Sequence, residues 1–246
     1  MKTSAFLAAL AAGTLATSAS AQIAPLLNEF DPNPAGGDPA ETTVELLGSP
    51  NSSYDLWILS IENDGINGTV DRASNVTGSF DANGLAVALV PDFENPSNTV
   101  ILSSAFSGSI GDDLDPTDSG TLDTSSLGIV YDAVGVSDAA GDDSTLYASG
   151  LGGTDILFNG QFEPLLVFRD SITNAWYQTV TVNFGAPDQR IGAFAANGGP
   201  EIDPALFTPN ASSDTFGDIN PTLVPEPATF ALAGLGALAM LRRRSA

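Results

Sequence analysis

Short apolar runs separated by turn-forming residues occupy most of this 246-residue chain. The runs are rich in β-branched and aromatic residues, and Gly, Asn, Asp, Ser and Pro lie between them, which is typical of strands joined by turns. No segment between residues 22 and 224 has the apolar period of a helix. Both a sandwich and a barrel are compatible with this pattern. We expect an all-β body built as an antiparallel β-sandwich. The expected strands lie at 42–47, 56–62, 85–91, 99–103 and 128–136.

The stretch 175–184, AWYQTVTVNF, alternates between apolar and polar residues. A period of two with one apolar face indicates a half-buried antiparallel strand. We therefore expect Trp176 to lie in the core, and we expect the same of Trp57 in the 56–62 strand. The face shared with Trp176 comprises Val180, Val182 and Phe184, and the polar face comprises Tyr177, Thr179, Thr181 and Asn183.

The first 21 residues have the composition of a secretory signal peptide. Lys2 supplies a positive charge, residues 5–15 are apolar, and Ala19-Ser20-Ala21 forms a small-residue cleavage site before Gln22. The alternative is a buried N-terminal helix. The order of the three features favours a signal peptide over residues 1–21, cleaved between Ala21 and Gln22.

An apolar run at residues 228–241 predicts a membrane-inserted helix near the C-terminus. Its 14 residues would span about 21 Å as a helix, whereas the hydrocarbon core of a bilayer is about 30 Å thick. Arg242, Arg243 and Arg244 follow the run and would stay on the cytoplasmic side, which places the body outside. A tilted stop-transfer anchor remains an alternative.

The same C-terminal residues resemble the PEP-CTERM sorting signal of exported bacterial proteins. Pro225, Glu226 and Pro227 form the literal triplet, followed by the apolar helix and the arginine cluster. The resemblance implies recognition and removal of the tail by an exosortase, and membrane attachment through the helix before processing. Whether the tail is removed or retained stays open.

The composition of residues 206–224 differs from that of the preceding body. These residues are rich in Pro, Ser, Thr and Asn, and such segments often form linkers. We expect a β-sandwich domain at 22–205, a flexible spacer at 206–224 and the sorting signal at 225–246. The alternative is a segment packed on the domain through Phe207 and Phe216.

The body is strongly acidic. Its three arginines, Arg72, Arg169 and Arg190, stand against all 30 acidic residues of the chain, so residues 22–226 carry a net charge of −27. Such a surface repels nucleic acid phosphates, so we expect no nucleic-acid partner. It favours solubility outside the cell over a specific cation-binding role, which stays open.

The chain has no cysteine or histidine, and the body has no lysine. These absences exclude a Ser-His-Asp triad, a cysteine nucleophile and a lysine Schiff base. Zinc and haem sites lose their usual ligands. Catalysis would need carboxylates, a tyrosine, an arginine or a carboxylate-bound metal.

A loop at residues 111–123 gathers carboxylates that could serve as Ca²⁺ ligands, since this ion takes six to eight oxygens. The EF-hand pattern fails, because Asp118 stands at the sixth position, counted from Asp113, where glycine is required. A solvated acidic loop is the favoured interpretation. The candidate calcium ligands are Asp112, Asp113, Asp115 and Asp118.

Several segments resemble bacterial lamin-tail-like domains. The first is a strand ending in Asn28-Glu29, then a Pro/Gly/Asp loop, then Val44-Glu45-Leu46; segments 54–64 and 129–138 resemble later parts of that family. Two departures stand out: Leu56 replaces the usual glycine before Trp57, and the segment 65–127 is long. The resemblance implies an immunoglobulin-like sandwich with an adhesion or scaffolding role, not an enzyme.

We therefore expect an exported cell-surface or extracellular-matrix protein whose partners are an exosortase and either an extracellular polysaccharide or a surface protein. The alternative is a secreted carbohydrate-active enzyme that uses carboxylates, with or without Ca²⁺. A deep cleft holding two acids beside aromatic residues would favour the enzyme. A filled sandwich with shallow loops would favour the scaffold.

Overall fold

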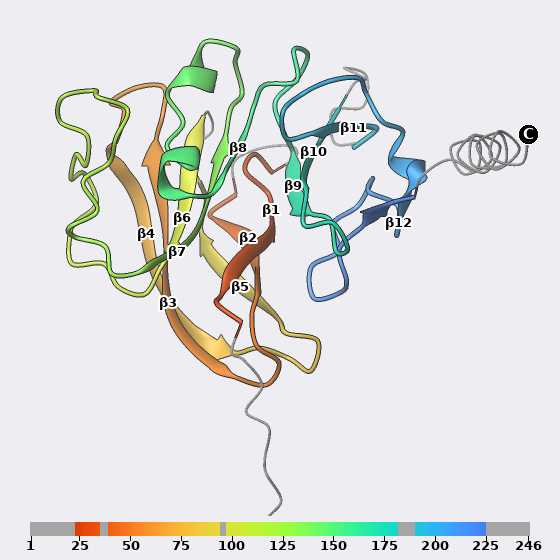
Figure 1. The fold of residues 1–246 in the computed structure, drawn as a ribbon, viewed down its shortest axis with the longest axis horizontal. Helices are drawn as coiled ribbons and strands as arrows, with labels where there is room; N and C mark the ends of the chain where they lie inside the picture. The colour runs from red at the N-terminus through yellow and green to blue at the C-terminus, as the bar shows by residue number, and fades with distance from the viewer. Residues whose placement is uncertain (1–22, 35–38, 94–96, 182–189, 225–246) are drawn as a thin grey trace, which may run out of the picture.

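Two β-sheets pack face to face in the computed structural model, which describes residues 23–34, 39–93, 97–181 and 190–224 (Figure 1). The first sheet is fully antiparallel and has the strand order β11-β10-β9-β1-β2-β5. Its strands are β1 (Leu26–Phe30), β2 (Glu41–Leu47), β5 (Leu85–Pro91), β9 (Leu166–Arg169), β10 (Trp176–Val180) and β11 (Gly192–Ala195).

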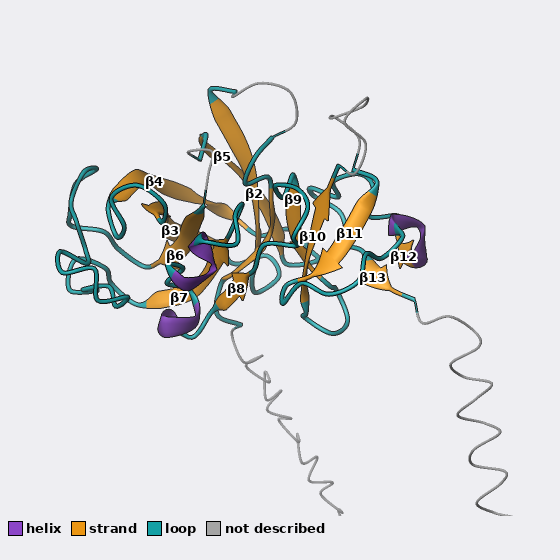
Figure 2. Ribbon diagram, turned by 90° about the horizontal axis from the view of Figure 1, so that it is seen from above, coloured by secondary structure: helices purple, strands orange, loops and turns teal. Residues whose placement is uncertain are grey.

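The second sheet has the order β4-β3-β6-β7-β8, and only its last pair, β7 with β8, is parallel. Figure 2 shows this sheet beside the first, seen from above. Its strands are β3 (Ser53–Glu62), β4 (Val70–Ser79), β6 (Asn98–Ser103), β7 (Val130–Val136) and β8 (Thr154–Ile156).

The space between the sheets is filled by alternate residues of both. Leu56 and Ile58 of β3 face Val44 and Leu46 of β2 across this core, and Trp176 closes it beside Phe30. The described body is therefore mostly β, with two sheets in which antiparallel pairs dominate, and this is consistent with the expected β-sandwich. The described residues contain only three short 3-10 helices, Asp142–Ser144, Ser149–Leu151 and Pro204–Leu206, and within that same part of the chain no helix is long and apolar enough to cross a bilayer.

The outer face of the second sheet is covered by two connecting segments, residues 104–129 and 144–151, which we call the acidic-loop cover. Leu114, Leu127 and Tyr147 of these segments pack on Leu59 and Ile101 of the sheet. Trp57 also points to this side, where its ring lies 5.7 Å from that of Phe106. The prediction that both tryptophans lie in the core between the sheets was therefore correct for Trp176 and wrong for Trp57, which is half-buried on the outer face of its sheet.

The outer face of the first sheet is covered by residues 206–223, which we call the C-terminal cover. It contains a two-stranded ladder of β12 (Phe207–Thr208) and β13 (Thr222–Leu223). Phe207 is buried against Phe168 and Tyr177, and Figure 1 shows the blue segment beside β9 to β11. The expected flexible spacer is therefore packed on the domain, because its aromatic residues complete an apolar cluster.

This cover also changes the prediction for the 175–184 strand. Trp176 and Val180 face the core as expected, but Thr179 on the opposite face is fully buried too. The polar face is only partly open to solvent, with Tyr177 and Thr181 half-buried, because β10 lies between the core and the C-terminal cover. Val182, Phe184 and Asn183 lie outside the described residues, as do the signal peptide 1–21 with its Ala21–Gln22 cleavage site, the helix 228–241, the triplet 225–227 and Arg242 to Arg244.

Candidate functional site

Three of the four candidate calcium ligands, Asp112, Asp113 and Asp115, accept hydrogen bonds from amides of their own loop. Asp112 accepts from the Ser109 amide at 2.7 Å, and Asp113 accepts from the Asp115 amide at 2.9 Å. Asp118 lies in a turn and has a positive φ of 48°. In the part of the chain that the structure describes, no three acidic side chains are placed to hold one metal ion. Calcium binding at this loop stays a prediction without a geometric basis.

Asp115 is the buried member of this loop and stabilises the acidic-loop cover. Its two oxygens accept from the Ser119 amide at 2.9 Å, the Gly120 amide at 2.7 Å and the Tyr147 hydroxyl at 3.1 Å. Burial opposes its ionisation, but these donors outweigh burial and lower the pKa of Asp115. The carboxylate therefore acts as an ionised acceptor that joins two segments of the cover.

A second acidic site, missed by the sequence analysis as a site, lies under the C-terminal cover. Glu29 of β1 and Glu45 of β2 are opposite each other in the ladder and both are fully buried. Thr215 donates its amide and its hydroxyl to Glu29 at 2.9 and 2.6 Å. Glu45 accepts from the Gly217 amide and from the Asn28 side chain, each at 2.6 Å.

Burial dominates the electrostatics of this pair. Desolvation raises the pKa of Glu29 to about 8, and the hydrogen bonds from Thr215 only partly offset it. Desolvation likewise raises the pKa of Glu45 to about 7. Arg190 forms an ion pair with Asp31 at 2.8 Å. Its guanidinium donates no hydrogen bond to Glu29 or Glu45, whose donors are given above. The pair is sealed from solvent, so it holds the cover and does not meet a substrate in this conformation.

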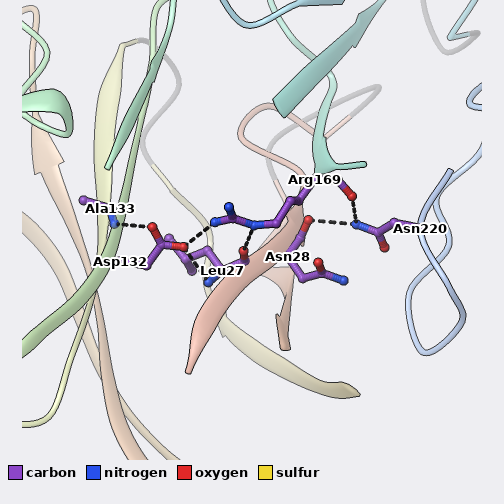
Figure 3. Close-up of polar contacts among 6 residues, drawn as sticks. All are labelled: Leu27, Asn28, Asp132, Ala133, Arg169 and Asn220. Atoms are coloured by element: carbon purple, nitrogen blue, oxygen red, sulfur yellow. Dashed lines mark hydrogen bonds and ion pairs between the residues drawn. The ribbon is translucent and has the colours of Figure 1, made fainter. Parts of the chain in front are cut away.

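An arginine joins the first sheet to the second (Figure 3). Arg169 forms an ion pair with Asp132 of β7 at 2.6 Å and donates to the Leu27 carbonyl at 3.1 Å. Its guanidinium carbon lies 4.7 Å from the ring centre of Trp176, a cation–π distance. One side chain thus ties β9 to β1 and to the opposite sheet.

The backbone carbonyls of Asn28 and Arg169 are bridged by a side chain of the C-terminal cover. Asn220 is buried and its amide nitrogen donates to both carbonyls, at 2.9 and 3.0 Å (Figure 3). This amide satisfies two buried acceptors at the point where the β1–β9 ladder ends at Glu29 and Phe168. The cover is therefore part of the sheet's hydrogen bonding.

The end of the described chain is held by one carboxylate. Asp170 accepts from the Leu223 amide at 2.9 Å and from the Thr222 hydroxyl at 3.0 Å. The Val224 amide donates to the Leu206 carbonyl at 2.9 Å. Burial opposes the ionisation of Asp170, but the hydrogen bonds prevail and lower its pKa. The folded body thus extends to the residue before the Pro-Glu-Pro triplet.

The sequence contained partial signals for this region. Asn28-Glu29 and Val44-Glu45-Leu46 were singled out as a motif, and Arg169 is one of only three basic residues of the body. Nothing in the sequence singles out Asn220 or Asp170. Their roles depend on how residues 206–224 return to the sheet.

Comparison with protein families gives one match. The PEP-CTERM protein-sorting motif matches residues 223–245. Comparison with curated proteins and with solved structures gives no significant match, so the family of the body is not identified. The matched segment begins at Leu223, inside β13, and processing by an exosortase is what this motif implies. The chain is thus a protein with a PEP-CTERM sorting motif, of a class that is exported and associated with the cell surface.

Proposed function

We propose that the β-sandwich body is an adhesion or scaffolding module that is displayed at the cell surface or in the extracellular matrix. In this proposal an exosortase recognises Pro225, Glu226 and Pro227 and removes the apolar run and the arginines. The sorting motif supports export and exosortase processing, and the structure of the body supports adhesion or scaffolding over catalysis.

One observation carries the choice of role: the sandwich is filled, and its buried carboxylates are covered. The inter-sheet core is continuous from β3 to β10. Glu29 and Glu45, the two acids that face each other on neighbouring strands, are sealed under the C-terminal cover. Glycoside hydrolysis needs two acids that flank a substrate, and this pair has no room for one.

The relation of the body to lamin-tail-like domains is part of the proposal. The Asn28-Glu29 and Val44-Glu45-Leu46 segments form the β1–β2 pair, and Trp57 lies in β3. A two-sheet sandwich agrees with the immunoglobulin-like fold that the resemblance implies. The support is the shared fold class and these short motifs.

The test of the route is the mass and location of the mature protein in its native host. We expect a form that begins at Gln22, lacks the apolar run and is found at the surface. Replacing Pro225, Glu226 and Pro227 together by alanine should leave the tail uncleaved in the membrane fraction. The matched control replaces Pro200 and Glu201, an exposed Pro-Glu pair of the body, by alanine.

Full-length chain from Gln22 to Ala246 in wild-type membranes, with no shorter surface form, would overturn the proposed processing. The role is tested by deleting the gene and measuring cell aggregation and attachment. A deletion strain that aggregates and attaches like the wild type would overturn the adhesion role. Normal sorting of the control variant and retention of the triple variant would assign recognition to the triplet.

A further inference from the structure

A cavity of about 240 Å³ opens on the outer face of the first sheet, at the edge of the C-terminal cover. Its walls come from the turn before β5, the turn between β9 and β10, and the cover itself. Neighbouring strands supply Leu85, Leu47 and Asn28, and the cover supplies Ile219 and Asn220. The volume lies below the roughly 300–1,000 Å³ of pockets for drug-sized ligands, so it suits one small group.

Several polar groups that line the cavity have unused hydrogen-bonding capacity. Asn28 is buried and donates to Glu45 through its side-chain nitrogen, which leaves its side-chain oxygen without a donor among the described residues. The Ser171 hydroxyl and the Asn174 side-chain amide form no hydrogen bond within the same part of the chain. Together these groups offer both donors and acceptors to a ligand.

The oxygens of the one carboxylate that lines the cavity are already engaged by hydrogen-bond donors. Asp170 is its one ionisable lining residue, and that carboxylate already accepts from the Thr173 amide, the Thr222 hydroxyl and the Leu223 amide. The net charge of −27 over residues 22–226 opposes an anion. Leu47, Leu85 and Ile219 form an apolar wall, and Ile219 is 62% exposed. A matching ligand is neutral, with hydroxyl groups and an apolar surface.

We propose that this cavity binds one neutral sugar residue of an extracellular polysaccharide. The hydroxyls of a sugar ring both donate and accept hydrogen bonds, which matches the polar groups of the cavity. The C–H faces of the ring are apolar, which matches the wall formed by Leu47, Leu85 and Ile219. This inference deepens the proposed adhesion function and rests on it for the source of the sugar. The rival occupant, a polar peptide segment, is an outcome of the test.

Binding is linked to the C-terminal cover. Ile219 and Asn220 belong to the cover, so the cavity is complete only when residues 206–223 are docked. A ligand that binds only this form stabilises it, by an amount that grows with ligand concentration over its dissociation constant. A sugar should therefore raise the melting temperature and protect the cover from proteolysis.

The experiment is calorimetric titration of the mature protein recovered from its native host. The probes are glucose, galactose, mannose and N-acetylglucosamine as monosaccharides and short oligomers, with glucuronate and a Gly-Ser peptide for comparison. We expect at least one neutral sugar to bind with a Kd of about 1 mM, and glucuronate not to bind. Asn174→Gly should weaken binding about tenfold, the effect of about one hydrogen bond.

Glycine suits this position because Asn174 has a φ of 60°, so the variant keeps the backbone and loses only the amide. Asn75→Ala removes an exposed amide from β4 of the other sheet and should leave binding unchanged. Absence of sugar binding, equal binding by the Asn174 variant, or binding of the peptide alone would overturn the assignment. Surface display is measured separately by fractionation, so a displayed protein that binds no sugar refutes this inference alone.

Discussion

Two covers close the outer faces of the sandwich, and they use buried carboxylates in opposite ways. Under the acidic-loop cover, Asp115 receives four hydrogen bonds and its pKa is lowered. Under the C-terminal cover, Glu29 receives two and its pKa is raised to about 8. Glu29 lies deeper in the domain and near other acids, whereas Asp115 has more donors, so the depth of burial and the number of donors together set the direction of each pKa shift.

The difference has a consequence for how each cover responds to conditions. The C-terminal cover is most stable where Glu29 is protonated, and the acidic-loop cover where Asp115 is ionised. Alkali should therefore loosen the C-terminal cover at Glu29, whereas strong acid should loosen the acidic-loop cover at Asp115 and the Asp170 contact of the C-terminal cover.

The largest expected effect is the loss of unfolding free energy when a core tryptophan is removed, compared with the loss at a tryptophan under a cover. Trp176→Ala should lower the free energy of unfolding by about 3–5 kcal/mol, because it empties a buried site between the sheets. Trp57→Ala should cost about 1–2 kcal/mol, since Trp57 is half-buried beside Phe106. Urea denaturation of both variants measures the two losses. Equal losses would show that the acidic-loop cover buries its sheet as fully as the core does.

The second prediction concerns alkaline pH. Glu29 has a pKa near 4.5 when unfolded and about 8 when folded, so between these values only the folded state holds the proton. Its contribution is complete below pH 4.5 and is lost as pH rises toward 8, with a slope of up to about 1.4 kcal/mol per pH unit. Denaturation midpoints at several pH values should show this fall.

Glu29→Gln should reduce that pH dependence, because glutamine resembles the protonated acid and does not titrate, and the remaining slope should come from Glu45, whose pKa is also raised. Glu201→Gln, at an exposed position, is the matched control and should leave the wild-type slope unchanged. A slope as steep as that of the wild type after the Glu29 substitution would assign the titration to other carboxyls, with Glu45 the first to test by the same change.

The third prediction tests the opposite behaviour at Asp115. Tyr147→Phe removes a hydrogen bond of 3.1 Å to this carboxylate and should cost about 1–2 kcal/mol near neutral pH. A lowered pKa contributes stability that is present above the unfolded value of 3.8 and is lost as pH falls through the folded pKa. The cost should therefore shrink in strong acid, as measured by denaturation against pH. Tyr131→Phe, at a half-buried position in β7, is the control.

The smallest expected effect is that of calcium. A site in the acidic loop would stabilise the fold by about 2.7 kcal/mol at a hundredfold excess over its Kd, or roughly 5–10 °C in melting temperature for a domain of this size. We expect no such rise, because three of the four carboxylates already accept hydrogen bonds and no three acidic side chains of the described residues are placed to hold one ion. A rise with calcium that sodium does not reproduce at matched ionic strength, and that Asp118→Asn abolishes, would contradict this.

The sequence pattern predicted the strands that consist mainly of apolar residues. The expected segments 42–47, 56–62, 85–91 and 99–103 lie within β2, β3, β5 and β6, because their residues fill one or both faces of a sheet. β4 was missed because most of it is polar and only partly buried, and pairing with β3 holds it in the sheet. Such a strand has no periodic apolar signal.

The hydrogen-bonded sites under the two covers could not be predicted from the local sequence pattern. A bulge between Leu27 and Glu29 sets the register that places Glu29 opposite Glu45, and a bulge leaves little trace in composition. Thr215, Gly217 and Asn220 belong to a segment whose composition is that of a linker. Their partners lie far away in the sequence, so only the fold brings them together.

The central position of β1 determines when the domain can close. This first strand lies between β2 and β9 in its sheet. Its Leu27 carbonyl accepts a hydrogen bond from Arg169, 142 positions later, and its Asn28 carbonyl accepts one from Asn220, 192 positions later. Contacts of such high contact order form slowly, and a chain emerges from synthesis with its N-terminus first. The first strand can therefore pair early with β2, but it lacks β9 and Asn220 until nearly the whole body has emerged, and Asn220 comes shortly before the Pro-Glu-Pro triplet.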